Sequence, residues 1–179
     1  TGDYSHSLLI LAATQLLTSS RGAVGAAQMA GLLYVGRNLV QVLASYPIGV
    51  LADRYGSLPV LVIGYTLGGL TAMMTALVFA FAINDLLILG AIFFIAGLYV
   101  ATQEALESTV TADLVTTDTL GISYGALGTV NGTAKFVSSA AIGLLWTTVS
   151  PGFSFGLAAL LMFGGTIMLA RLRGARVSR

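Results

Sequence analysis

The chain has 179 residues, of which 56% are hydrophobic and only 8% are charged, and its formal net charge is +1. A soluble domain usually carries about 25% charged residues, so this composition excludes an ordinary water-coated globule and indicates lipid as the surrounding medium. The chain contains no cysteine, which excludes disulfides and cysteine-ligated metals, and no basic stripe points to nucleic acid. We expect no cofactor.

Six apolar segments follow one another, each close to or above the roughly 20 residues that a membrane span needs. They cover residues 4–20, 23–53, 58–83, 85–114, 121–149 and 151–172. We therefore predict an all-α membrane protein in which residues 1–179 form a single domain of six transmembrane helices. Helix N-caps are predicted at the last three breaks, at Asn84-Asp85, at Thr117 or Asp118, and at Ser150-Pro151. Gly64-x-x-x-Gly68 and Gly128-x-x-x-Gly132 predict helix-packing seams.

The positive residues set the expected orientation. An even number of spans places both termini on one side, and most arginines outside the spans fall there: Arg54, Arg171, Arg173, Arg176 and Arg179. Among loop residues, only Arg21 falls on the opposite side. Cytoplasmic loops carry the excess of Lys and Arg. We therefore expect a multi-pass protein of a bacterial inner membrane with both termini in the cytoplasm.

The polar residues are unevenly distributed among the six segments. Segments 58–83 and 151–172 carry no charge between their ends, whereas Arg37 lies in the second segment and Lys135 in the fifth. At 1.5 Å per residue both cations lie roughly 20 Å along their segments, near the middle of a membrane. Cations at matched positions predict a 3+3 inverted repeat, with a site near the midplane.

The loop after the second segment resembles a known signature. Its sequence, Gly49-Val-Leu-Ala-Asp53-Arg54-Tyr-Gly56, is similar to the Gly-x-Leu-Ala-Asp-Arg-x-Gly loop of the major facilitator superfamily. Residues 103–125 resemble the tenth helix, the following loop and the start of the eleventh helix in bacterial members. The resemblance covers nearly the whole chain and corresponds to the C-terminal six helices of a twelve-helix transporter.

This resemblance implies roles for the segments and for the loop. The first and fourth segments would line a central cavity, the second and fifth would meet another half, and the third and sixth would face lipid. Gly49, Asp53, Arg54 and Gly56 would serve as the gating or structural motif. Two departures put the usual charge-held gate in question, because Ser57-Leu58 replaces the expected basic residue and residues 116–120 contain no cation. Arg37 stands where relatives tend to be apolar.

A charge at the centre of a membrane costs about 2.5–3.5 kcal/mol on insertion scales, so it is rarely without a role. We expect the following residues to line a cavity for a small solute: Arg37, Asn38, Gln41, Asn131 and Lys135. The two cations favour an anionic solute. The alternative is an internal ion pair, for which Glu104 is the nearest candidate partner.

Glu104 and Glu107 lie three residues apart and therefore share one face of the fourth segment. Burial disfavours the charged form of a carboxylate, so such a group can load and release a proton during a transport cycle. We predict proton coupling through this pair, with Glu104 the deeper of the two. Alternatively, Glu107 simply lies at the water interface.

These features predict a half-size secondary transporter that works by alternating access as a parallel homodimer. One alternative is the C-terminal half, or a fragment, of a longer transporter that needs a different partner half. Another is a membrane scaffold or assembly subunit that transports nothing. No enzyme is predicted, because Gly121-Ile-Ser-Tyr-Gly125 fits the hydrolase elbow in letters only and opens a predicted helix.

Overall fold

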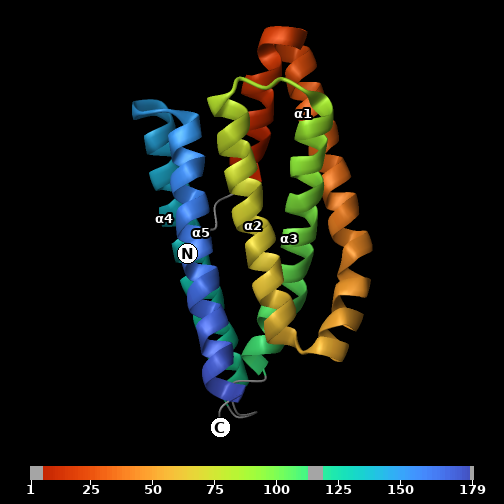
Figure 1. Ribbon diagram of the computed structural model, residues 1–179, viewed down its shortest axis with the longest axis vertical. Helices are drawn as coiled ribbons and strands as arrows, with labels where there is room; N and C mark the ends of the chain where they lie inside the picture. The colour runs from red at the N-terminus through yellow and green to blue at the C-terminus, as the bar shows by residue number, and fades with distance from the viewer. Residues whose placement is uncertain (1–5, 113–118, 178–179) are drawn as a thin grey trace.

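The computed structural model describes residues 6–112 and 119–177, and these residues form a bundle of long helices (Figure 1). The helices are α1 (His6–Tyr55), α2 (Ser57–Ala80), α3 (Leu86–Ala112), α4 (Leu120–Thr148) and α5 (Pro151–Val177). No strand occurs within these described ranges. The all-α prediction therefore agrees with the structure, which has five helices where six were expected.

The difference in number arises at Gly22, inside α1. Its backbone has φ 70° and ψ 168°, which is not helical and divides α1 into a first arm, residues 6–21, and a second arm, residues 23–55. Figure 1 shows the chain reversing direction near this point, so the two arms run side by side in opposite directions. The predicted segments 4–20 and 23–53 correspond to these arms.

Two of the three predicted caps lie within the described residues, and both are confirmed. The Asp85 carboxylate accepts hydrogen bonds from the backbone N–H groups of Leu87 (2.7 Å) and Ile88 (3.2 Å) at the start of α3. The Ser150 hydroxyl accepts one from the backbone N–H of Phe153 (3.2 Å), and Pro151 is the first residue of α5. Thr117 and Asp118 lie outside the described residues.

Helix α2 packs against both α3 and α5, and glycines make the close approach possible. A Cβ atom on Gly64 would lie 2.4 Å from Thr102 of α3, and one on Gly68 would lie 2.5 Å from Met162 of α5. Small residues of this kind allow helix backbones to approach closely in membranes. The predicted seam at Gly64 and Gly68 is therefore confirmed.

Of three buried clusters among the described residues, two join most of the helices. The first joins both arms of α1 to α2 and α3 through residues that include Leu16, Leu17, Ala26, Ala30 and Phe93. The second joins α2, α3, α4 and α5 through residues that include Tyr99, Ile142, Phe155, Ala158 and Met162. These two clusters together include buried residues from all five helices.

Helix α4 is the most exposed part of this bundle and packs mainly on α5. Its end is fixed by Trp146, whose ring lies 5.6 Å from the rings of Phe79 and of Phe155 and whose indole N–H donates to Gln15 (3.1 Å). A Cβ atom on Gly128 or Gly132 would meet nothing within 4 Å. The predicted seam at these two glycines is therefore wrong for the single chain.

Three helical stretches are long and apolar enough to cross a membrane among the residues that the structure describes. They are Ser57–Ala80 in α2, Leu86–Glu107 in α3 and Pro151–Arg171 in α5. Helix α1 and helix α4 carry more polar residues along their length. Some of these polar residues form the contacts described next.

Candidate functional site

Arg37 is the most deeply buried charged side chain of the described residues, with 3% of its surface exposed. It lies in the second arm of α1, and its Nη1 atom donates a hydrogen bond to the side-chain oxygen of Asn38 (2.7 Å). The guanidinium group lies over the Tyr34 ring, 5.5 Å from the ring centre, which is a cation–π geometry. The other two nitrogens, Nε and Nη2, are buried and have no hydrogen-bond partner among the described residues.

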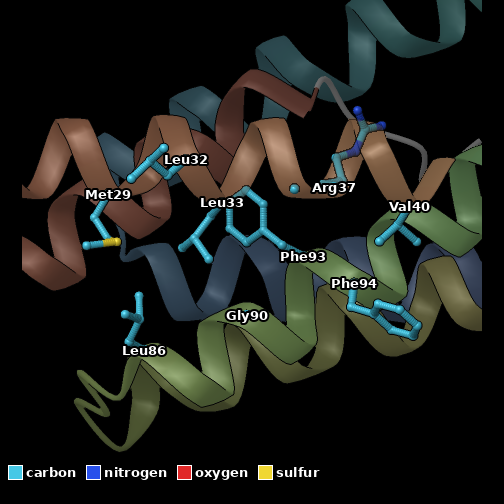
Figure 2. A pocket seen from close by; sticks show the side chains of 10 residues that line it. Met29, Leu32, Leu33, Arg37, Val40, Leu86, Gly90, Phe93 and Phe94 are labelled. Atoms are coloured by element: carbon cyan, nitrogen blue, oxygen red, sulfur yellow. The ribbon is translucent and has the colours of Figure 1, made fainter. Parts of the chain in front are cut away.

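A pocket of about 300 Å³ opens between the second arm of α1 and α3, beside Arg37 (Figure 2). Its lining is almost entirely apolar and comprises Met29, Leu32, Leu33, Gly36, Arg37, Val40, Leu86, Gly90, Phe93 and Phe94. Figure 2 shows the guanidinium group pointing away from Val40 and Phe94. The pocket is therefore mainly apolar, and the charged end of Arg37 does not point toward Val40 and Phe94.

A second polar contact links the same arm of α1 to α3. The side-chain amide of Gln41, one turn beyond Arg37, donates to the Glu104 carboxylate (2.6 Å). The two helices approach closely near this contact, because a Cβ atom on Gly97 would lie 2.8 Å from the backbone oxygen of Arg37. Four predicted residues are thus brought together at the α1–α3 contact: Arg37, Asn38, Gln41 and Glu104.

Glu107 lies one turn further along α3 and is half-buried. Its carboxylate accepts hydrogen bonds from Gln103 of the same helix (3.0 Å), from Asn131 of α4 (2.8 Å) and from the Tyr65 hydroxyl of α2. One carboxylate therefore connects three helices. Hydrogen bonds to a charged acceptor are about twice as strong as neutral ones.

The remaining predicted cavity residue, Lys135, is half-buried and lies one turn beyond Asn131 on α4. Three of the predicted cavity residues therefore lie at the contact of α1 with α3, Asn131 lies where α4 meets α3, and Lys135 lies further along α4.

The loop signature lies at the end of the bundle where α5 also ends (Figure 1). Gly56 joins α1 to α2 with φ 90°, a left-handed backbone conformation that favours glycine. Asp53 and Arg54 are exposed in the last turn of α1, and Gly49 lies inside that helix. The break at Gly22, next to Arg21, lies at the opposite end of the bundle.

Three aromatic or amide residues of this site were missed by sequence reasoning: Tyr34, Tyr65 and Gln103. Gln103 carried a usable signal, because a residue four positions before Glu107 lies on the same helix face. Tyr65 and Tyr34 carried none, since tyrosine is common in apolar segments and its partners depend on how the helices are rotated.

Comparisons with known proteins give one family and one relative. A family model described as Major Facilitator Superfamily matches residues 3–179. The chain is 32% identical over 126 residues to an uncharacterized MFS-type transporter of Methanocaldococcus jannaschii. The aligned stretch covers 69% of this chain but only 29% of the relative, so the chain spans well under half of the relative's length. No solved structure matches the chain.

Proposed function

Because the chain belongs to the Major Facilitator Superfamily, we propose that it moves a small solute across a membrane by alternating access. One observation carries the proposal beyond the family: Arg37 is 97% buried in an apolar bundle, as its 3% exposure shows. An ionisable group in the membrane interior is costly and is typically kept for a substrate or ion pathway.

The cavity would form where the polar contacts of α1, α3 and α4 meet. Arg37, Asn38 and Gln41 would contribute from α1, and Asn131 and Lys135 from α4. The signature Gly49, Asp53, Arg54 and Gly56 would act at the inner end as the gating or structural motif. The six-segment, 3+3 inverted-repeat arrangement, in a bacterial inner membrane with both termini cytoplasmic, is part of this proposal.

Six helical segments make half of an alternating-access transporter, so a second half is needed. We propose that two copies pair in parallel, since the two halves of such transporters are related by an axis along the membrane normal. Exposed apolar residues on the second arm of α1 support this pairing. They recur at alternating spacings of three and four residues, as in a helix–helix seam: Leu32, Val35, Leu39, Val42 and Tyr46.

A second candidate has a specific observation in its favour. The relative is much longer than this chain, because 126 aligned residues make up 29% of it. The chain would then be the C-terminal half of a longer transporter, with a different half completing the cavity. A scaffold that transports nothing is a weaker alternative, because packing alone does not require a buried arginine.

Proton coupling would involve Glu104 more directly than Glu107. Glu104 is exposed, and its carboxylate accepts a hydrogen bond from the Gln41 amide. The Glu107 carboxylate accepts hydrogen bonds from three side chains, on α2, α3 and α4, and is therefore part of the helix packing. Because Glu104 is exposed and is not part of that packing, it is the carboxylate of the pair that we propose carries the proton.

Transport by purified protein in liposomes tests the proposal. A panel of small organic solutes is offered to vesicles that contain a pH-sensitive dye, and counterflow of a labelled hit is then measured. In the wild type we expect the transport of at least one solute to be accompanied by a pH change inside the vesicles. A Glu104→Gln variant should keep counterflow, which needs no coupling, and lose uphill transport driven by a proton gradient.

Protein-free vesicles are the control, and a Glu107→Gln variant tests whether the second carboxylate of the pair is also needed. If no solute moves in vesicles that contain correctly folded protein, transport by this chain alone is wrong. If Glu104→Gln still concentrates solute against its gradient, Glu104 does not couple protons.

A further inference from the structure

The Arg37 guanidinium group uses only one of its two donor edges. Nη1 donates to Asn38, and the Tyr34 ring supports the flat face of the group. The N–H groups of Nε and Nη2 point the same way along the other edge, and both atoms are buried without a partner among the described residues. Buried donors without an acceptor are rare in native proteins and call for an explanation.

We propose that this Nε–Nη2 edge binds a single carboxylate group of the transported solute. The assignment rests on the proposed transport function and names its substrate class, a small organic monocarboxylate. The two parallel N–H groups match the two oxygens of a carboxylate in a bidentate arrangement. Asn38 and Tyr34 fix the orientation of the group, so the edge is held ready before the solute arrives.

Charge balance favours a carboxylate over a phosphate ester. One guanidinium carries one positive charge, so a monoanion leaves the buried pair neutral. A phosphate group carries about two negative charges near neutral pH, and its second charge would remain uncompensated in an apolar surrounding.

Gln41 keeps Glu104 from occupying this binding edge. Glu104 lies within electrostatic range of Arg37 and is the acidic side chain that could occupy the free edge itself. Its carboxylate is instead held by the Gln41 amide, one turn along α1 (2.6 Å). A solute carboxylate and Glu104 would therefore compete for Arg37, and Gln41 would bias the competition toward the solute.

The edge is covered in this conformation, because the exposed surface of both nitrogens is negligible. A solute can reach it only when the helices around Arg37 separate, which is the movement that alternating access supplies. The apolar pocket of Figure 2 is not the carboxylate-binding site, since the guanidinium group points away from Val40 and Phe94 there.

Thermal unfolding of the purified chain in nanodiscs tests the proposal without requiring transport. The probes are acetate and benzoate, compared at constant ionic strength with acetamide and benzamide, which have the same shapes and no charge. We expect the carboxylates to raise the melting temperature in a saturable manner and the amides to leave it unchanged. No saturable effect of either carboxylate, or tighter binding of inorganic phosphate than of benzoate, would overturn the assignment.

Variants distinguish hydrogen bonding by the paired donors of this edge from the effect of a positive charge alone. Arg37→Lys keeps the positive charge and loses the paired donors, so the benzoate dissociation constant should rise by roughly tenfold to a hundredfold. Gln41→Leu releases Glu104 onto Arg37 and should weaken benzoate binding by about tenfold. The double variant Gln41→Leu with Glu104→Gln removes the competitor and should restore binding. Unchanged binding in Arg37→Lys, or no restoration in the double variant, would contradict the mechanism.

The ligand-free melting temperature of each variant shows whether it still folds. If carboxylates bind but no solute is transported in liposomes, the proposed binding site is supported and the proposed transport function is refuted. Transport of solutes that carry no carboxylate would keep the function and refute the site.

Discussion

Glu107 illustrates how one residue can hold several helices in an apolar bundle. Its carboxylate accepts hydrogen bonds from Tyr65, Gln103 and Asn131, on α2, α3 and α4. Helix α4 has few other contacts with α3, so the bond from Asn131 is a main link between these two helices. The carboxylate therefore contributes to stability in addition to any role in transport.

Replacing Glu107 by Ala should lower the free energy of unfolding by about 1–3 kcal/mol, because three donors lose their charged acceptor. For a chain of this size the melting temperature should fall by about 3–10 °C. Glu104→Ala is the matched control, since Glu104 lies on the same helix, is exposed and accepts a hydrogen bond from Gln41. Equal effects of the two substitutions would show that the three-helix cluster adds no stability.

At this scale the sequence was informative about charges and uninformative about their partners. Arg37, Glu104 and Glu107 could be singled out because a charge within an apolar segment is costly wherever it lies. The bond from Tyr65 to Glu107 joins residues 42 positions apart and depends on the rotation of α2 against α3. Segment composition does not determine that rotation, so Tyr65 could not be predicted.

At the scale of the elements, helix ends followed local chemistry and were predictable. Asp85 and Ser150 cap α3 and α5 because their side-chain oxygens reach backbone N–H groups two or three residues ahead. Packing between helices was less predictable, as the glycines show. Gly64 meets Thr102, whereas Gly128 and Gly132 carry the same spacing and meet nothing within 4 Å. The spacing permits close contact, but a facing helix must be present for the contact to form.

The reversal of α1 at Gly22 gives a prediction at this scale. Its φ of 70° and ψ of 168° lie in a region that is essentially restricted to glycine. Gly22→Ala should destabilise the chain by about 1–3 kcal/mol, although a Cβ atom there would meet nothing within 4 Å. Thermal unfolding measures the effect.

Gly31→Ala is the matched control for this substitution. Gly31 lies inside the second arm of α1, and its added Cβ atom would also meet nothing within 4 Å. Alanine favours a helix over glycine by about 1 kcal/mol, so this variant should be as stable as the wild type or more stable. If the two variants behave alike, the reversal at Gly22 does not depend on its backbone conformation.

For the whole molecule, the distribution of exposed apolar residues bears on assembly. Exposed apolar side chains occur on α5, as at Leu160, and on the second arm of α1, as at Leu39. Only the second face adjoins the polar group around Arg37 and Gln41. A partner half placed against that face would enclose the polar residues, whereas lipid against it would leave Gln41 and Glu104 beside hydrocarbon chains. The costs of such exposure favour a protein partner.

The mass of the gently extracted protein tests that arrangement. Native mass spectrometry from nanodiscs should give a dimer, twice the 18.4 kDa of one chain. Leu39→Asn places a polar group in the proposed seam and should shift the protein toward monomers by about tenfold or more, since a buried amide without a partner costs about 1–3 kcal/mol. Leu160→Asn on α5 is the matched control and should leave the dimer intact. A monomer under every mild condition would mean that the cavity is completed by a different half, and the fragment alternative would then replace the homodimer.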